Sequence, residues 1–147
     1  MAEPKHLNDQ LFVTGQPSKT DIVRFAEQGF RTIINNRPDD EELGQLSAAE
    51  AKVEAERAHM AYVHLPVRPG AITASDVEAF QRAVRKSPPP VVAHCRTGIR
   101  SYLLWGAGEA MSGKRDVADV VKQAADAGYD LNSLSALMAR LRTEGVT

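Results

Sequence analysis

Short β-branched runs alternate with helical segments through the first hundred residues, and this alternation constrains the fold more than any other feature of the sequence. The expected strands are residues 10–14, 31–36, 61–67 and 91–93. The expected helices are residues 19–28, 47–59, 73–86, 99–111, 117–127 and 131–142. Such an alternation predicts an α/β fold whose four- or five-stranded, mainly parallel sheet is flanked by helices on both faces. The first run ends at Gly15-Gln16-Pro17 and is typical of an edge strand.

Length and charge limit the classes of protein to which the chain can belong. With 147 residues, of which 43% are hydrophobic, it is expected to form a single domain over residues 1–147. The formal net charge of -1 argues against a nucleic-acid partner. The sequence has no membrane-spanning apolar stretch and no signal-peptide pattern, so we expect no membrane partner and a cytoplasmic location. A single cysteine and four histidines without metal-ligand spacing predict no disulfide, no metal and no cofactor.

The segment from Val91 to Ser101 carries the chemistry. An apolar strand ends at Cys95, a tight loop containing Gly98 follows, and an apolar helix begins. Ligands of such folds bind outside the carboxyl ends of the strands, where loop N–H groups and the next helix amino end attract anions. A nearby Arg100 favours the thiolate form of the cysteine, and a thiolate in an anion site is a nucleophile for an oxyanion.

The remaining loop residues complete this expected anion site. They are Arg96, Thr97, Gly98 and Ile99. Gly98 suits a position that needs positive φ or that a side chain would obstruct. The alternative is that Cys95 is only a small buried hydrophobe. Two arginines within five residues after it favour the functional interpretation, because a core position rarely attracts arginine.

The motif His-Cys-x-x-Gly-x-Arg-Ser, residues 94–101, resembles the signature loop of the protein-tyrosine and dual-specificity phosphatase superfamily. Supporting motifs at residues 11–18, 29–38 and 62–67 occur in the order which that superfamily shows. The chain is similar to the bacterial phosphatase-like domain of the beta-lactamase hydrolase-like proteins over roughly residues 6 to 112. The resemblance implies a dual-specificity-phosphatase-like fold, with Cys95 as the nucleophile and His94 tuning its thiolate. That domain also occurs fused to persulfide-handling metalloenzymes, which implies a protein partner in sulfur metabolism.

The cysteine loop departs from the phosphatase pattern in its length. Phosphatases of the superfamily place the arginine six residues after the cysteine, whereas Arg100 follows Cys95 by five and Ser101 holds the sixth place. The shorter spacing resembles the active-site loop of rhodanese-type sulfurtransferases, which carry a persulfide on the cysteine.

The second departure concerns the general acid. The superfamily places an aspartate on the loop after the strand that ends here at Pro66, but residues 67–71 contain none. Asp39 or Asp40, just after Arg37-Pro38, are the candidates for an acid from another loop. A phosphate ester needs a proton for its leaving alkoxide, whereas sulfite leaving thiosulfate does not.

Several further residues have two interpretations. Arg37 and Arg68 either help to hold an anion or are surface arginines, and His94 either tunes the thiolate or is a buried, hydrogen-bonded core residue. Ser101 is expected to donate a hydrogen bond to the thiolate or to cap the helix. The pair Glu41-Glu42 is interpreted as a solvated face.

These observations predict thiol-based group transfer on a small oxyanion or persulfide substrate. We favour sulfane-sulfur transfer, because both departures from the phosphatase pattern point to it. One alternative is a phosphatase that hydrolyses phosphomonoesters, on protein phosphotyrosine or a small molecule, through a phosphocysteine intermediate. The other is a non-catalytic regulatory domain that binds anions.

Overall fold

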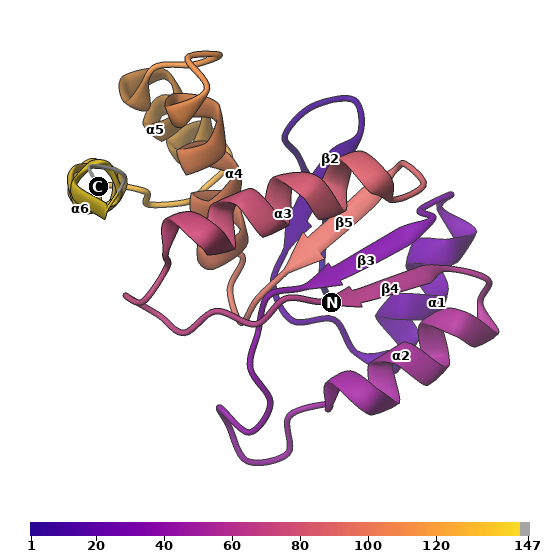
Figure 1. Cartoon of the computed structure of the whole chain (residues 1–147). Helices are drawn as coiled ribbons and strands as arrows, with labels where there is room; N and C mark the ends of the chain where they lie inside the picture. Colours follow the sequence, from indigo (N-terminus) through magenta and orange to yellow (C-terminus); the bar gives the residue numbers. More distant parts are fainter. Residues whose placement is uncertain (145–147) are drawn as a thin grey trace.

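The computed structural model describes residues 1–144 as one mixed sheet with helices on both sides (Figure 1). The sheet order is β1-β2-β5-β3-β4. These strands are β1 (Lys5–His6), β2 (Leu11–Thr14), β3 (Thr32–Asn35), β4 (Ala61–His64) and β5 (Val91–His94). All neighbouring strands pair in parallel except β1, which is antiparallel to β2. The predicted fold class, with a five-stranded and mainly parallel sheet, is confirmed.

Six helices follow the strands at the places the sequence predicts. They are α1 (Lys19–Glu27), α2 (Ala48–Arg57), α3 (Ala74–Lys86), α4 (Ile99–Met111), α5 (Val117–Asp126) and α6 (Leu134–Glu144). Ser18 and Thr73 form capping boxes at the starts of α1 and α3. Among the described residues, no helix is both long and apolar enough to span a bilayer.

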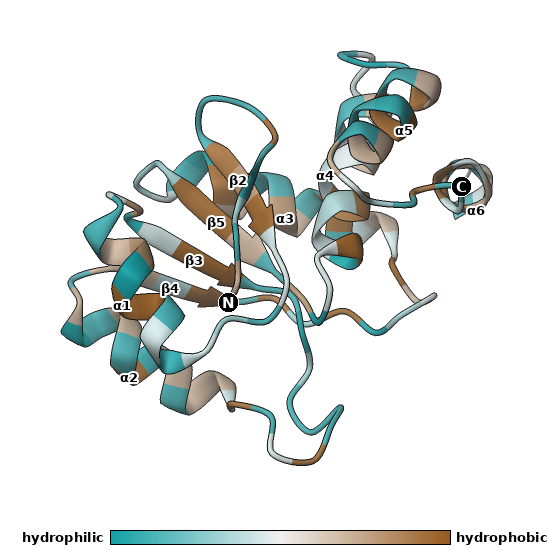
Figure 2. Ribbon diagram, turned by 180° about the vertical axis from the view of Figure 1, so that it is seen from behind, coloured by the Kyte–Doolittle hydropathy of each residue, from teal (hydrophilic) through white to brown (hydrophobic). Residues whose placement is uncertain are grey.

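Alternating side chains of the strands divide the core into two layers. Ile33 and Val92 face α1 and α2, and they pack with residues such as Phe25. Ile34 and Ala93, the next residue in each strand, belong to the larger cluster beneath α3 and α4. Figure 2 shows hydrophobic residues in the strands, and helices such as α1, α2 and α5 that combine hydrophobic and hydrophilic residues. The sheet is therefore held rigidly from both sides, as a scaffold for a loop site requires.

The first predicted strand is not at the edge of the sheet. Its residues pair with β5 on one side, in the register Leu11 to Val91, and with β1 on the other. The prediction of an edge strand for residues 10–14 is therefore wrong. The strand β1 has only two residues, both exposed, so it leaves no periodicity in the sequence from which it can be predicted.

The parallel register brings the carboxyl ends of four strands level with one another. Thr14 and Asn35 both pair with His94, and Asn35 also pairs with His64. Cys95 is the next residue after this row, so the loop that carries it begins at the carboxyl edge of the sheet.

Candidate active site

Cys95 lies at the amino end of α4, where the backbone of the loop surrounds its sulfur. The residue is fully buried, and the N–H of Gly98 donates to Sγ over 3.1 Å. Gly98 is the N-cap residue of α4, so the unpaired N–H groups of the first helical turn lie beside the thiol. The sulfur of Cys95 thus faces a backbone donor and the amino end of α4.

Gly98 is required at its position for two reasons, both anticipated from the sequence. Its φ is +106°, in the left-handed region that glycine adopts readily. A Cβ atom on Gly98 would also lie 2.7 Å from Oη of Tyr129, which is closer than such contacts occur. Sequence reasoning missed Tyr129, because it follows α5 and nothing local links it to the cysteine loop.

Arg100 is anchored by a carboxylate from another loop. Its Nη1 and Nη2 donate to the two carboxylate oxygens of Glu41 over 2.8 and 2.9 Å, and Nη1 also donates to the carbonyl oxygen of Val67 over 2.9 Å. Burial alone would lower the pKa of Arg100, but the hydrogen bonds with Glu41 and the charge of Cys95 outweigh it and raise that pKa. The guanidinium is thus fixed in place as a cation beside the thiol.

Arg37 is the second buried arginine of the site, and each of its three guanidinium nitrogens donates a hydrogen bond to a side chain. Its side chain is only 1% exposed. Nε donates to Glu41 over 2.9 Å, Nη2 to Glu42 over 2.8 Å and Nη1 to the Gln16 side chain over 3.2 Å. The exposed Arg96 reaches Glu42 with its Nε 3.6 Å away. Each guanidinium nitrogen of Arg37 thus binds a side chain of its own chain, so Arg37 orders the loop that carries Glu41 and Glu42.

The expectation that Glu41-Glu42 forms a solvated face is wrong for Glu41. Glu41 bridges Arg37 and Arg100, and its side chain is only 19% exposed. Hydrogen bonds from Arg100 lower the pKa of Glu41, and hydrogen bonds from Arg37 lower that of Glu42. The sequence did contain a signal for these site residues, namely two adjacent acids soon after the polar end of a strand. Sequence alone does not show which arginines the two acids meet.

The two aspartates proposed as a general acid lie away from the cysteine loop. Oδ1 of Asp39 accepts a hydrogen bond from the backbone N–H of Ala48 over 2.8 Å, so this carboxylate holds the first residue of α2. Asp40 is exposed, with a φ of +61°. Neither residue lines the pocket around Arg100. The turn after Pro38 directs the glutamates, not the aspartates, toward the arginines.

Ser101 binds Asn36, the residue after β3, instead of the sulfur of Cys95. Its hydroxyl donates to Oδ1 of Asn36 over 2.8 Å, and the N-cap position that it was expected to fill belongs to Gly98. Asn36 in turn donates its N–H to the His94 carbonyl oxygen over 2.7 Å and its side-chain amide to the Leu65 carbonyl oxygen over 3.0 Å. Asn36 thus connects α4 to the ends of β3, β4 and β5. The sequence analysis did not name Asn36 as a site residue, although the polar end of the predicted strand pointed to it.

His94 is a buried neutral residue. Its Nδ1 lies 3.2 Å from the carbonyl oxygen of Cys95, and the buried Nε2 has no hydrogen-bond partner among residues 1–144. Burial, with smaller repulsive contributions from Arg37, His64 and Arg100, lowers the pKa of His94 to about 4. The imidazole therefore carries no charge near neutral pH, and its influence on Cys95 is limited to the shape and dipoles of the loop.

This lowered pKa predicts an acid sensitivity of the fold. Below the ordinary pKa of 6.5, the unfolded chain binds a proton at His94 that the folded chain binds only near pH 4. Stability from this group is complete above pH 6.5 and is lost as the pH falls toward 4, by about 3 kcal/mol at 1.36 kcal/mol per pKa unit. We expect the unfolding free energy, measured with urea, to fall more steeply in the wild type than in His94→Gln. Parallel pH curves for the two proteins would contradict this.

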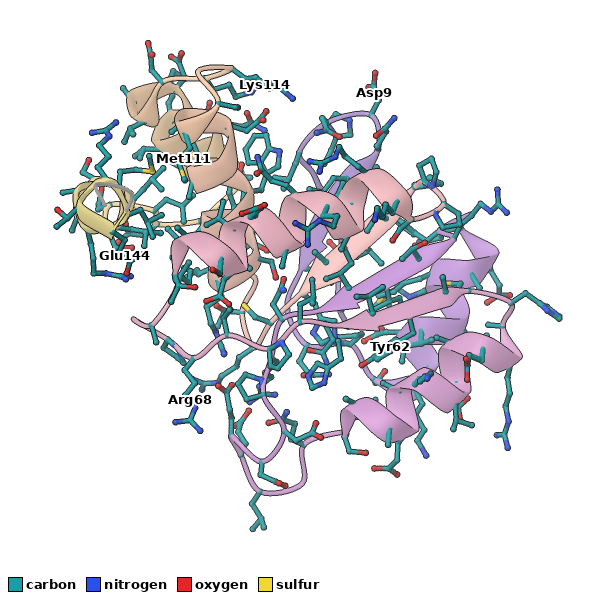
Figure 3. All side chains as sticks on the ribbon, viewed as in Figure 1. Asp9, Tyr62, Arg68, Met111, Lys114 and Glu144 are labelled. Atoms are coloured by element: carbon teal, nitrogen blue, oxygen red, sulfur yellow. The ribbon has the colours of Figure 1, made fainter. Side chains whose placement is uncertain are left out.

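The open pocket beside the loop is lined by three of the six predicted anion-binding residues and by Arg100. Its volume is about 640 Å³. Its walls are Glu41, Glu42, Pro69, Arg96, Thr97, Ile99 and Arg100. Arg68 is exposed and is not part of these walls, and Figure 3 shows its side chain extending away from the sheet. Gly98 does not line this pocket but contacts the Cys95 sulfur from within the loop, and Arg68 lies outside.

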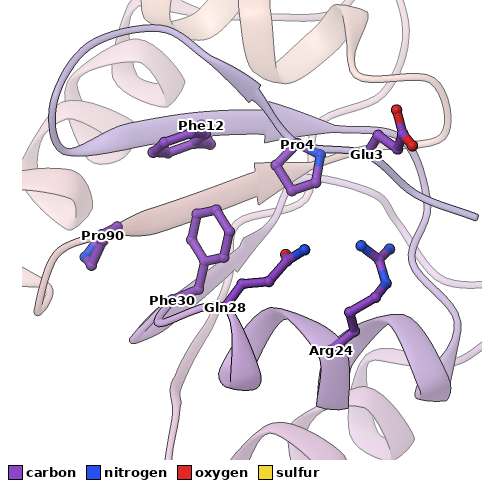
Figure 4. Close-up of a pocket in the computed structure, with 7 residues that line it drawn as sticks. All are labelled: Glu3, Pro4, Phe12, Arg24, Gln28, Phe30 and Pro90. Atoms are coloured by element: carbon purple, nitrogen blue, oxygen red, sulfur yellow. The ribbon is translucent and has the colours of Figure 1, made fainter.

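A separate hollow lies toward the opposite end of the strands (Figure 4). Phe30 and Pro90, which line it, come just before β3 and β5, whereas Cys95 comes just after β5. Arg24 points into the same hollow, and Asp21 already accepts a hydrogen bond from it over 3.0 Å. None of the predicted site residues contributes to this hollow. The chemistry of the loop therefore belongs to the carboxyl edge of the sheet.

The fold and the cysteine loop together define a protein of the phosphatase-like class. A family model described as "Beta-lactamase hydrolase-like protein, phosphatase-like domain" matches residues 4–112. The chain belongs to this family, as its motifs predicted. A "Beta-lactamase hydrolase-like protein" of Xylella fastidiosa is 38% identical over 127 residues, which cover 85% of this chain but only 29% of that protein.

Solved structures agree with this assignment. A structure of a "putative phosphatase" from Neisseria meningitidis is 35% identical, with a TM-score of 0.85, and the match covers 92% of this chain and 96% of that one. The "kinase associated phosphatase" is only 14% identical, with a TM-score of 0.69 and coverage of 90% and 87%, and it shows a likeness of fold alone. The predicted dual-specificity-phosphatase-like architecture is thereby confirmed.

Proposed function

We propose that this protein transfers sulfane sulfur through a persulfide on Cys95. The observation that carries the proposal is the state of the two carboxyl groups in the pocket. Hydrogen bonds from arginines lower the pKa values of both Glu41 and Glu42, so they are carboxylates near neutral pH. They are therefore poor proton donors, and an alkoxide leaving group needs a proton donor, whereas sulfite or a thiolate does not.

The reaction balances without an acid. The Cys95 thiolate attacks the outer sulfur of thiosulfate, an S–S bond forms on Cys95, and the S–S bond of thiosulfate breaks with its electron pair leaving on sulfite. The resulting Cys95 persulfide anion then gives its outer sulfur to a nucleophilic acceptor, which regenerates the thiolate. With an organic persulfide as donor, the leaving group is the corresponding thiolate. Arg100 and the amino end of α4 stabilise the negative charge in each step.

The second candidate is a phosphatase, and the relatives favour it. The family description contains the term "phosphatase-like", and the similar Neisseria structure is called a putative phosphatase. In that reaction Cys95 attacks phosphorus, the alcohol or phenol leaves, and water hydrolyses the phosphocysteine. Since the pocket carboxyls are ionised, we expect this activity only with activated leaving groups such as nitrophenol.

The curated relatives extend well beyond the region that this chain matches. The chain spans 29% of the Xylella protein. Sulfur transfer requires a donor and an acceptor, so we include in the proposal a protein partner in sulfur metabolism and a reducing cytoplasmic location. A reducing environment would keep the thiol of Cys95 available.

Mass spectrometry of the intact protein distinguishes the two reactions. After incubation with thiosulfate or glutathione persulfide, we expect Cys95 to become one sulfur atom heavier, and cyanide to remove this sulfur as thiocyanate. The Cys95→Ser variant is the matched control and should gain no sulfur. We expect phosphotyrosine to be hydrolysed at least about a hundredfold more slowly than the sulfur donor reacts. Robust hydrolysis of phosphotyrosine without a persulfide adduct would favour the phosphatase.

A further inference from the structure

A second, apolar groove adjoins the pocket around Arg100. It has a volume of about 510 Å³, within the usual range of small-molecule sites. One wall is the connection between β4 and α3, which contributes Pro69 and Ile72, and another is the side of α4, with Leu103. The third wall is α6, with Ala136 and Leu137, and α6 packs directly on α4 (Figure 1). None of the residues from α6 was a predicted site residue.

The groove and the anion pocket adjoin each other and share one wall. Pro69, Ile99 and Arg100 line both of them. Ile99 is the first residue of α4, directly after Gly98, whose N–H contacts the sulfur of Cys95. A substrate whose reacting atom is held at Cys95 would therefore place its organic group over Ile99 and in the groove.

The far side of the groove has a cationic side chain. Arg140 lies on α6 and lines the groove, and its side chain is 42% exposed. One donor, Nη1, contacts Glu144 over 3.3 Å, and Oε2 of Glu144 accepts a hydrogen bond from the N–H of Ala74. A guanidinium has five N–H donors, so Arg140 retains donors for a second anion. A carboxylate is the group that such a planar donor set binds best in a partly exposed position.

We propose that this groove binds the organic group of the substrate, and that this group is apolar with a carboxylate at its far end. The proposal rests on the proposed function, since it assumes that the reacting atom is held at Cys95. The same chemistry describes the thiol part of an organic persulfide and the alcohol part of a phosphomonoester. The proposal implies that inorganic donors are not the preferred substrates, because thiosulfate has no organic group to fill the groove.

Binding to the groove is measurable without any reaction. We expect 4-phenylbutanoate, which has neither a sulfur nor a phosphoryl group, to shift the backbone NMR signals of Ile99, Leu103 and Ala136 in a saturable way. We expect 4-phenylbutanamide to bind the wild type at least threefold more weakly. The two probes should bind Arg140→Gln equally well, whereas Arg142→Gln on the same helix should retain the preference for the carboxylate.

Substitutions of exposed alanines on α6 provide the matched steric test. Ala136 lines the groove and Ala139 does not, although both are exposed residues of the same helix. We expect Ala136→Phe to weaken binding of 4-phenylbutanoate at least tenfold and Ala139→Phe to leave it unchanged. If the probe shifts none of the groove signals, or if the two variants behave alike, the groove is not the binding site.

Reactions at Cys95 identify the source of the organic group. We expect Ala136→Phe to lower the rate of persulfide formation from the persulfide of 6-mercaptohexanoate, an apolar chain with a terminal carboxylate, at least tenfold, and the rate from thiosulfate less than twofold. If hydrolysis of naphthyl phosphate is the activity that falls instead, the organic group belongs to a phosphomonoester. If the probe binds as expected but neither donor reacts in the wild type, the proposed function fails and the groove remains a binding site. Equal effects of Ala136→Phe on both sulfur donors would overturn the assignment of the groove to the substrate.

Discussion

Replacing Cys95 with serine should abolish turnover while leaving the fold and the affinity for anions in place. A serine hydroxyl is a much weaker nucleophile than a thiolate at neutral pH, and loss of a nucleophile lowers kcat by a factor of at least about 10⁴. The anion site survives, because it consists of the backbone of the loop, the amino end of α4 and Arg100. Persulfide formation and ester hydrolysis should both disappear from the variant.

The variant also separates chemistry from folding. The serine side chain is only slightly smaller than that of cysteine, so we expect the unfolding free energy to change by about 1 kcal/mol at most. Calorimetric titration with sulfate should give a similar affinity for the wild type and Cys95→Ser. The nearby Ser101 cannot substitute as the nucleophile, because its buried hydroxyl is committed to Asn36. Turnover that persists in Cys95→Ser would refute the mechanism.

The fold could be predicted from the sequence because its signals are local. Strands such as β3 and β5 are short apolar runs, and helices such as α1 and α3 begin at capping residues that are recognisable without tertiary information. The strand β1 could not be predicted, since two exposed residues pair only because β2 lies beside them. The order of the strands likewise depends on contacts between segments far apart in sequence.

The same division applies to the site. The cysteine loop was predictable because Cys95, Gly98 and Arg100 lie within six residues and their geometry is determined by one strand and one helix. The role of the Glu41 carboxylate could not be predicted, because Glu41 and Arg100 are 59 residues apart in the sequence. Its position follows from the turn after Pro38, where Asp39 holds the start of α2. Sequence reasoning therefore named Asp39 and Asp40 as candidate general acids, whereas the acids of this loop that meet the arginines are Glu41 and Glu42.

These contacts also explain why a net charge of -1 is compatible with an anion site. Three arginines, Arg37, Arg96 and Arg100, converge at the carboxyl edge of the sheet, and two glutamates partly neutralise them. A dianionic phosphate gains less from a partly neutralised cluster than from free arginines. This balance of charge supports the proposed preference for an organic persulfide over a phosphate ester.

Replacing Arg100 with lysine should reduce turnover at least about a hundredfold, although the positive charge is kept. The planar guanidinium donates two parallel hydrogen bonds to Glu41 and a third to the Val67 carbonyl oxygen. A lysine ammonium cannot form this paired arrangement, so the cation would no longer be fixed beside Cys95. The measurement is kcat for persulfide transfer, with thermal unfolding to establish that the variant is folded.

Arg96→Lys is the matched control, because Arg96 belongs to the same loop but is exposed and contacts Glu42 only over 3.6 Å. We expect its kcat to remain within about threefold of the wild type, as exposed ion pairs contribute little. If Arg100→Lys were as active as Arg96→Lys, Arg100 would act only as a source of positive potential. A large loss in Arg100→Lys alone would instead indicate that catalysis depends on the orientation that Glu41 and Val67 impose on the guanidinium.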